Sequence, residues 1–533
     1  MLSVVGLLAT VLVAALLVTV EALVEPAPAP ALAATAPRLL EPAPPPMCAG
    51  RTTTGPRQLR GMWLTTVSNR DFPSRPGLDV ATIQAEYRTW LDVAQRMNHN
   101  AVFVHVRPSG DAFWPSDYVL WSEWLTGRRD GTSPGWDPMA FMVAETHARN
   151  MEFHAWFNPY KASQAGNLAD LPPNHPLARH PEWAVSYPQG SKSARLYYNP
   201  GIPEARRYVE DSILEPVRKY DLDGVHFDDF FYPYPAPKKD FLDQQAFAQY
   251  GGGATKADWR RQNVNQFVRE MNARIKEIKP WVKFGISPFG IWRNQTSDPK
   301  GSATNGLESY GAIYADTRLW VKQGWLDYVV PQLYWYIGFD KADYAKLLPW
   351  WSSVVEGTDV QLYIGQADYR VGEKGPWGDP AQLDRQLALN TKYSVSGSIH
   401  FSAKQVRDDA LGAVSRYRKA HYGGPALVPA MRHLPGIRPF PPKLNTAHRD
   451  AEGAVTLGWT AQGDAAVRHA VYRVELETAD PPQLIGTVTG GAGRVSWTDR
   501  TATAGKAYAY CVTGLDRLWN EGPASMAEVV ARS

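Results

Sequence analysis

Cysteine is scarce in this sequence, and signals of several other protein classes are missing. The 533 residues include two cysteines, Cys48 and Cys511, which excludes a disulfide scaffold and leaves open a single bridge between them. No Cys/His spacing is that of a zinc site, and no glycine-rich phosphate loop follows a predicted strand. The net charge is +3 without a basic run, which disfavours a nucleic-acid partner. We predict neither a metal nor a cofactor.

Aromatic residues, in contrast, are abundant. The chain has 20 Trp, 25 Tyr and 17 Phe, which together make up 12% of it. Such a content is typical either of a large core or of a sugar-binding cleft, because the apolar faces of pyranose rings stack on aromatic rings.

The N-terminus has no charged residue between Val4 and Val20, in VVGLLATVLVAALLVTV. This run is typical of an export signal, and Ala31-Leu32-Ala33 offers a small-x-small cleavage site. No Lys or Arg precedes the run, and about 17 apolar residues can also span a bilayer as an anchor. Residues 1–33 are therefore predicted to be a signal peptide or an N-terminal membrane anchor. Either places the rest of the chain outside the cytoplasm, secreted or on the cell surface.

Two proline-rich stretches divide the chain. Residues 34–58 are rich in Pro and Ala and residues 425–442 are again Pro-rich, which predicts extended linkers. They separate a large domain at 59–424 from a small one at 443–533. The small domain has short alternating strands, which predicts a β-sandwich of the fibronectin type III kind. Its proline-rich join predicts a spacer or binding module outside the active site.

The large domain alternates apolar runs with amphipathic helical stretches. Parallel strands buried on both faces read as such runs, and eight rounds fit a (β/α)₈ TIM barrel with enlarged loops. A doubly wound open sheet is the alternative fold. The runs span residues 60–67, 101–108, 151–159, 223–231, 283–289, 327–335, 360–369 and 397–403.

The strand ends of such a barrel form its active site, and DGVHFDDFF ends the fourth run. By alternation, Asp228 faces the barrel mouth, while Val225 and Phe227 face the helices. Asp229 stands one step further, where the loop can also turn it inward. Neighbouring aromatic rings would raise the pKa of such an acid. Either aspartate could instead cap a turn or pair with an arginine.

Further carboxylates are candidates for a second catalytic group. Asp111 follows the second strand and could act as an acid or pair with Arg107. Asp316 precedes a predicted helix, whose N-terminus favours an acid for structural reasons. The catalytic candidates are thus Asp228, Asp229, Asp111 and Asp316.

Polar and aromatic residues at the other strand ends could position a sugar. The histidines could also pack in the core or bind a metal, but the first strand lacks the His-x-His of metal-dependent barrels. The substrate-binding candidates are Arg107, His154, Asn158, Tyr160, His226, Tyr232, Arg293, Gln332, Tyr334 and Trp335.

From Arg60 to His421 the chain resembles the glycosyl-hydrolase-like 10 (DUF187-type) family. The motifs that carry the resemblance are RGMWLTT, VRPSGDAFWPSDYVLWSEWLTG, HAWFNPY, YYNPGIPEARRYV, DGVHFDDFFYPYP, GISPFGIWRN, ADTRLWVKQGWLDYVVPQLYW and GSIHFSA. The family's appended fibronectin-like module is similar to residues 440–533. The resemblance implies a TIM barrel, an extracytoplasmic location and glycan hydrolysis, which in one branch acts on peptidoglycan strands without peptide stems. Asp228 and Asp229 match the best catalytic position.

DGVHFDDF also resembles the strand 4 signature of chitinases. In that signature inward acids end in a glutamate, whereas Phe230 takes that place here. The departure argues against a plain chitinase mechanism and leaves the proton donor open.

We therefore expect an exported glycoside hydrolase that cleaves amino-sugar glycan strands, peptidoglycan without its peptide stems. The alternative is a non-catalytic protein that grips cell-wall glycan. If both Asp228 and Asp229 formed salt bridges, the non-catalytic glycan-binding protein would be favoured. Of the cations, Arg107 and Arg293 are placed to meet the substrate, with Lys161 nearby, which suits a polysaccharide partner of low charge density. The oligomeric state and the stereochemical outcome stay open.

Overall fold

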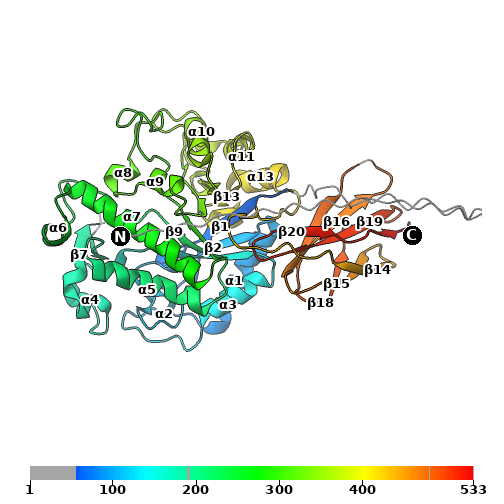
Figure 1. Cartoon of the computed structure of the whole chain (residues 1–533), viewed down its shortest axis with the longest axis horizontal. Helices are drawn as coiled ribbons and strands as arrows, with labels where there is room; N and C mark the ends of the chain where they lie inside the picture. The colour runs from blue at the N-terminus through cyan, green and yellow to red at the C-terminus, as the bar shows by residue number, and fades with distance from the viewer. Residues whose placement is uncertain (1–55, 189–192, 479, 532–533) are drawn as a thin grey trace, which may run out of the picture. The chain divides into compact units, whose positions relative to one another are not determined.

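A computed structural model describes residues 56–188, 193–478 and 480–531, and its largest element is a closed barrel of parallel strands (Figure 1). Each strand falls in one of the predicted apolar runs. Strands consecutive along the chain are neighbours, and β1 pairs with both β2 and β13, so the barrel is confirmed over the open sheet. The strands are β1 (Leu59–Leu64), β2 (Ala101–Arg107), β5 (Glu152–Phe157), β9 (Gly224–Phe227), β10 (Lys283–Ile286), β11 (Tyr328–Val329), β12 (Gln361–Gln366) and β13 (Gly397–His400).

Helices surround the barrel (Figure 1), and several begin at a residue that caps them. Asp79 accepts a hydrogen bond from the Thr82 amide at the start of α1, which satisfies a donor that a helix start leaves unpaired. The helices are α1 (Val80–Arg96), α2 (Glu123–Thr126), α3 (Pro138–His147), α4 (Pro176–Arg179), α5 (Pro203–Lys219), α6 (Gln244–Tyr250), α7 (Lys256–Ile278), α8 (Ser309–Ala312), α9 (Thr317–Lys322), α10 (Tyr344–Val355), α11 (Gln382–Asn390), α12 (Ala403–Asp408) and α13 (Ala413–His421).

The alternation predicted for β9 is what the structure shows. Val225 and Phe227 are fully buried in the layer between strands and helices, where the Phe227 ring stacks on Phe267 of α7 at 5.5 Å. His226 points the other way, into the barrel interior, where its ring lies parallel to Tyr328. This parity carries Asp228 to the mouth.

A connected group of polar side chains lies in the barrel interior among apolar and aromatic residues. Glu152, at the start of β5, forms a buried ion pair with Lys283, and its other oxygen lies 2.9 Å from His154 Nε2. The Tyr328 hydroxyl lies 3.0 Å from His154 Nδ1 and 3.3 Å from His226 Nδ1. Burial alone would raise the pKa of Glu152, but the charge of Lys283 and the bond to His154 outweigh it and lower that pKa.

Two glycines make room for these rings. A Cβ at Gly224 would lie 2.2 Å from His154 Nδ1, and one at Gly285 would lie 2.1 Å from the Tyr328 ring. Because no real Cβ approaches so closely, His154 and Tyr328 can cross the interior only where the neighbouring strands carry glycine.

Short strands within the long loops add two small sheets beside the barrel. One pairs β3 (Asp111–Ala112) with β4 (Leu120–Trp121), in the loop after β2. The other follows β5 and has the order β6-β8-β7, with β6 (Lys161–Ser163), β7 (Ala184–Pro188) and β8 (Ala194–Tyr198). This second sheet carries side chains that reach the barrel mouth.

The C-terminal part consists of two antiparallel sheets, as predicted. The first has the order β14-β15-β18 and the second β17-β16-β19-β20, with β21 also paired to β19. Leu457, Trp459 and Val512 belong to the core shared by the two sheets. The fibronectin type itself stays a prediction. The strands are β14 (Lys443–Arg449), β15 (Val455–Ala461), β16 (Arg468–Glu475), β17 (Gln483–Thr489), β18 (Gly493–Asp499), β19 (Tyr508–Leu515), β20 (Glu521–Ala524) and β21 (Glu528–Val530).

The sandwich contacts the barrel through a loop after β19. Trp519 is fully buried, packs among interior residues of the barrel strands, and donates a hydrogen bond of 2.7 Å from Nε1 to Glu152 Oε1. Arg517 forms an ion pair with Asp221. A spacer that hangs free would leave this indole in water, so these contacts argue against an independent module.

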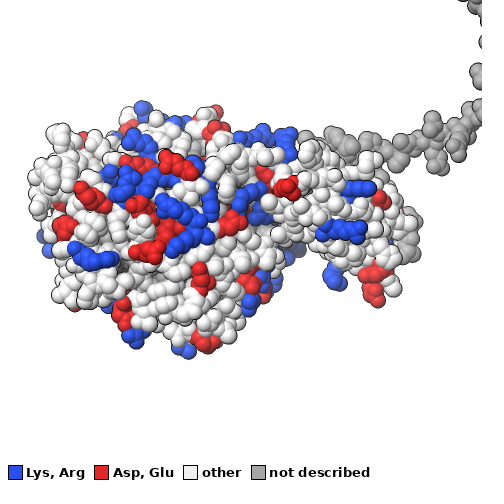
Figure 2. All heavy atoms as spheres, turned by 60° about the horizontal axis from the view of Figure 1, so that its bottom comes forward, with Lys and Arg blue, Asp and Glu red and all other residues white. Residues whose placement is uncertain are grey.

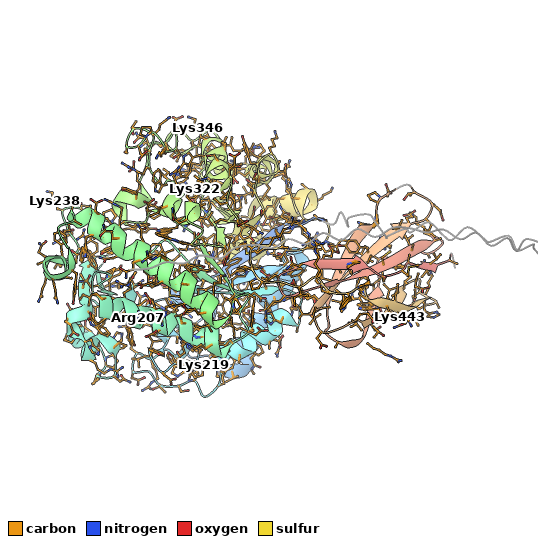
Figure 3. The ribbon with its side chains drawn as sticks, in the orientation of Figure 1. Arg207, Lys219, Lys238, Lys322, Lys346 and Lys443 are labelled. Atoms are coloured by element: carbon orange, nitrogen blue, oxygen red, sulfur yellow. The ribbon has the colours of Figure 1, made fainter. Side chains whose placement is uncertain are left out.

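Acidic and basic side chains are mixed on the surface. Figure 2 shows Lys and Arg interspersed with Asp and Glu over one face. The cations labelled in Figure 3 spread over the outside of several elements, with Arg207 and Lys219 both on α5, Lys322 on α9 and Lys346 on α10.

Several predictions concern residues outside the described part of the chain. The signal or anchor at 1–33, the linker up to residue 55 and Cys48, the partner proposed for Cys511, all lie there. Among the helices of the described residues, none has the length and apolar character needed to cross a bilayer. The domain boundaries stay predictions.

Candidate active site

A hollow of about 1300 Å³, part of it open to solvent, lies at the carboxyl ends of the barrel strands. This is where enzymes with this fold carry their active sites. We call it the mouth pocket. Its lining residues are Trp63, Thr65, Val67, Ser68, Arg70, His105, Pro108, Trp156, Asn158, Lys161, Gln164, Arg195, Asp228, Asp229, Phe230, Tyr234, Ser287, Gln332, Tyr334 and Phe401.

Asp228 stands directly after β9 and is 7% exposed. Its Oδ2 accepts hydrogen bonds from Trp156 Nε1 at 3.1 Å and from Asn158 Nδ2 at 3.4 Å. Its Oδ1 accepts one from the Phe230 amide at 3.1 Å. These bonds hold the carboxyl group at one position, as proton transfer requires.

Asp229 also faces the mouth pocket, because β9 ends at Phe227 and the chain turns. It is 4% exposed and accepts hydrogen bonds from the Tyr234 hydroxyl and from Gln332 Nε2, the latter at 3.1 Å. Gln332 is held in turn by a bond of 2.9 Å to the Ser287 carbonyl. Neither Asp228 nor Asp229 forms a salt bridge within the described residues, the arrangement that favours an enzyme over a binder.

The surroundings favour a proton on Asp228 at neutral pH. Burial, and then repulsion from Asp229, raise the pKa of Asp228 to about 8. Burial also raises the pKa of Asp229, but the bonds from Tyr234 and Gln332 oppose that rise. Two acids with separated pKa values can serve as proton donor and as ionised partner.

The pH dependence follows from these shifts. We expect kcat/KM to fall as the pH rises through about 8, where Asp228 loses its proton, and to fall at acidic pH, where Asp229 gains one. A rate profile between pH 4 and pH 10 measures both limbs. A rate that stays constant from pH 7 to pH 10 would remove Asp228 from the role of acid.

The same pKa shift should make the stability of the protein fall as the pH rises. Because the pKa of Asp228 is raised from 3.8 to about 8 on folding, its contribution is fully present below pH 3.8 and is lost as the pH rises through 8. Asp228→Asn removes this loss. The melting temperature of the variant should therefore exceed that of the wild type at pH 9 by more than at pH 5, and an equal difference at both would contradict the assignment.

Aromatic rings form the floor of the pocket. The His105 and Trp156 rings stack at 3.8 Å, and Trp63 Nε1 donates a hydrogen bond of 3.1 Å to His226 Nε2. Burial lowers the pKa of both histidines well below the ordinary value, so they are neutral. The floor thus consists of packed rings, and the indole N–H groups of Trp63 and Trp156 donate to His226 and Asp228.

Of the predicted site residues, Asp228, Asp229, Asn158, Gln332 and Tyr334 line the mouth pocket. The other two acids do not. Asp111 lies in an adjoining hollow, where it accepts a bond of 2.7 Å from the Ser109 amide. Asp316 caps α9 and accepts a bond of 2.8 Å from Trp292 Nε1, which is the structural role its position indicated.

The predicted arginines also lie away from the pocket lining. Arg107 is fully buried and donates to the Asn158 and Pro159 carbonyls at 2.7 and 3.0 Å, so it holds the loop after β5. Arg293 forms an ion pair of 2.7 Å with Asp298.

The remaining candidates support the site from outside the lining. His154 and His226 lie in the barrel interior, as described above. Tyr160 packs on Phe267 of α7 at 5.0 Å, Tyr232 packs on Tyr314, and the Trp335 carbonyl accepts a hydrogen bond from Gln386 Nε2. Side-chain parity breaks down where a strand ends, which is why these loop residues could not be oriented from the sequence.

Several lining residues were not among the site residues predicted from the sequence. Trp63 and Phe401 follow from the ends of the first and last strands, and Tyr234 from the aromatic run after Asp229. Arg195 lies on β8, far along the chain from any barrel strand, and Arg70 in the loop after β1. No sequence signal marks these two cations.

The described residues contain no group of three or more His, Cys, Asp or Glu side chains arranged to hold a metal ion. The hydrogen-bond partners of His154, His226 and His400 include at most one carboxylate each. The mouth of this TIM barrel thus holds two carboxylates among aromatic rings, which is the arrangement of glycoside hydrolases.

Comparison with known proteins also points to a glycoside hydrolase. The sequence profile of the family described as glycosyl hydrolase-like 10 matches residues 58–380. Glycosyl hydrolase YngK of Bacillus subtilis is 44% identical over 480 residues, covering 88% of this chain and 92% of its own. Glycosyl hydrolase DigH of Escherichia coli K12 is 39% identical over 396 residues, covering 70% and 89%. The chain therefore belongs to the glycosyl hydrolase-like 10 family, and it is a glycoside hydrolase.

Solved structures give a weaker likeness. The endo-β-1,4-mannanase of Thermotoga petrophila has a TM-score of 0.40 and 8% identity, covering 90% of this chain and 98% of its own. The endo-1,4-β-mannanase of Rhizomucor miehei has a TM-score of 0.42 and 10% identity, covering 70% and 99%. At these scores the likeness adds nothing to what the barrel itself shows.

Proposed function

We propose that this enzyme cleaves glycan strands of alternating amino sugars, and specifically peptidoglycan strands freed of their peptide stems. The observation that carries the proposal is a set of cations around the mouth pocket without acidic partners. Arg70, Lys161 and Arg195 line the pocket, and none of them forms an ion pair within the described residues.

Neutral groups hold the two arginines. The Arg195 guanidinium donates to the Gln164 side chain at 3.0 Å and to the Ala194 carbonyl at 2.9 Å. Arg70 lies over the Phe401 ring at 4.8 Å. Lys161 is 6% exposed, and burial and then repulsion from Arg195 lower its pKa to about 8. Cations without an acidic partner, of which Lys161 is buried, favour an anion that enters the pocket.

The chemistry of the wall polymer accounts for the preference. One sugar of each disaccharide carries a lactyl group, whose carboxylate is free only after the peptide stem has been removed, because the stem is joined to it as an amide. A stem-free strand therefore offers one anion per disaccharide, and intact wall offers none at that position. The rings of Trp63, Trp156, Tyr334 and Phe401 can stack on the sugars.

The test compares four glycans, with mass spectrometry of the products. Stem-free strands should be cut faster than intact peptidoglycan, and chitin oligomers, which lack the carboxylate, should be cut more slowly than stem-free strands. Equal cutting of intact wall would contradict the stem-free preference. Efficient cutting of a neutral β-glucan alone would contradict an amino-sugar substrate.

The cations can be tested separately. Arg195→Ala should raise KM for stem-free strands by about 10–100-fold, the scale of a lost charge-assisted hydrogen bond, and leave KM for chitin oligomers nearly unchanged. Arg128→Ala is the matched control, because this arginine is exposed and paired with Asp130. An equal change of KM for both glycans would show that Arg195 does not recognise the carboxylate.

An extracytoplasmic location belongs to the same proposal, since wall glycan lies there. It is supported by the uncharged run at residues 4–20. Fractionation of cells that produce the full chain, with and without residues 1–33, tests it. Recovery of the full chain in the cytoplasmic fraction would contradict the proposal.

A further inference from the structure

Both carboxylates among the described lining residues of the mouth pocket come from the same strand end. Asp228 and Asp229 follow β9 directly. Across the barrel, β13 lies four strands from β9 in the closed order, and β1, beside it, lies three strands from β9. That side contributes Trp63, Arg70 and Phe401, which include no acid and no thiol.

A mechanism with two protein carboxylates needs them on either side of the sugar ring. In retaining enzymes they stand about 5–5.5 Å apart and in inverting enzymes about 6.5–9.5 Å apart. The sequence candidates for the second group, Asp111 and Asp316, lie outside the pocket, each with its own structural bonds. Among the described residues, no protein carboxylate thus lines the side of the pocket opposite Asp228.

Asp229 is built to receive a donor from the substrate. Tyr234 and Gln332 donate to its two oxygens, which leaves acceptor capacity on a buried carboxylate that has no cation partner. It stands beside the carboxyl group of Asp228, on the same side of the sugar.

We infer that the nucleophile is the substrate's own 2-acetamido group, that Asp228 is the proton donor, and that Asp229 orients and stabilises this acetamido group. This inference rests on the proposed amino-sugar substrate and adds the requirement that the sugar at the cleaved bond carry a 2-acetamido group.

The acetamido oxygen forms a bond to C1 while the bond from C1 to the glycosidic oxygen breaks, and the Asp228 proton passes to that leaving oxygen. The product is a cyclic oxazolinium ion, whose N–H lies against the Asp229 carboxylate. Water then attacks C1, the C1–O bond to the acetamido group breaks, and the water proton returns to Asp228. C1 is displaced twice, so its configuration is retained.

The first experiment follows the anomeric configuration of the new reducing end by proton NMR immediately after cleavage of stem-free strands by the full chain. We expect retention. We also expect inhibition by the thiazoline analogue of the N-acetyl sugar, which mimics the cyclic intermediate, at concentrations at least about 100-fold below those of the parent sugar, as for transition-state analogues.

The second experiment changes the nucleophile and its partner. Replacing N-acetyl by N-trifluoroacetyl in a synthetic oligosaccharide makes the carbonyl oxygen a poorer nucleophile, and kcat should fall by about 100-fold or more. Tyr234→Phe removes the donor to Asp229 and should lower kcat with KM nearly unchanged, whereas Tyr250→Phe, at an exposed tyrosine, serves as the matched control.

The outcomes separate the two proposals. Cleavage with inverted configuration, or covalent labelling of the protein by a 2-fluoro sugar, overturns the acetamido mechanism and leaves the substrate proposal standing. Failure to cleave any 2-acetamido glycan overturns both. Retention together with thiazoline inhibition and the trifluoroacetyl effect supports the inference.

Discussion

Asp228→Asn is expected to lower kcat/KM on stem-free glycan strands by about 10²–10⁴-fold, the scale on which enzymes depend on a positioned acid. The amide is isosteric, can still accept from Trp156 and Asn158, and has no acidic proton to transfer to the leaving group. Steady-state kinetics at pH 6 and pH 7 measure the loss. The Asn side chain has the same shape and places no charge in the buried site, so the variant should fold normally. Circular dichroism and the melting temperature check this.

Asp117→Asn is the matched control, since this aspartate is exposed and lies outside the pocket lining. It should keep the wild-type rate. If Asp228→Asn retained full activity, or lost activity only because it unfolded, another group would have to be the proton donor.

Removing the C-terminal sandwich should cost the barrel its stability. A chain that ends at Gly424 lacks Trp519, exposes the barrel residues packed around it, and leaves Glu152 without its indole donor. Trp519→Ala in the full chain should lower the free energy of unfolding by about 3–5 kcal/mol, as large buried aromatic side chains do when truncated. Urea unfolding monitored by fluorescence and circular dichroism measures the change.

Met526→Ala is the control for this prediction, because Met526 is 84% exposed in the same sandwich and should change the free energy of unfolding by less than about 0.5 kcal/mol. A shortened chain with the wild-type melting temperature and rate would instead make the sandwich an independent spacer, as its proline-rich join had indicated.

Much of the barrel was predictable because its signal is local. Each strand is a short apolar run between helical patterns, and burial on both faces demands such runs wherever the strand lies. Alternation along β9 likewise placed Val225 and Phe227 under the helices and Asp228 at the mouth, since neighbouring side chains of a strand always point to opposite faces.

The site beyond β9 was predictable only in part. Asn158, Gln332 and Tyr334 directly follow strands and line the pocket as expected. Arg107 and Arg293 carry the right charge for a sugar acid, yet they bond to backbone carbonyls or to a nearby aspartate. Arg195 lines the pocket instead, because the small sheet after β5 carries it to the mouth.

The sequence by itself determined the barrel, its strand ends and the adjacent acids at the mouth, because hydrophobic periodicity and alternation depend on near neighbours along the chain. Only the tertiary structure decided that both acids are buried without an ion pair, that Lys161 and Arg195 meet beside them, and that Trp519 is buried against Glu152. These contacts join residues from tens to hundreds of positions apart, and their geometry depends on loop paths and on the packing of whole elements, which no local pattern encodes.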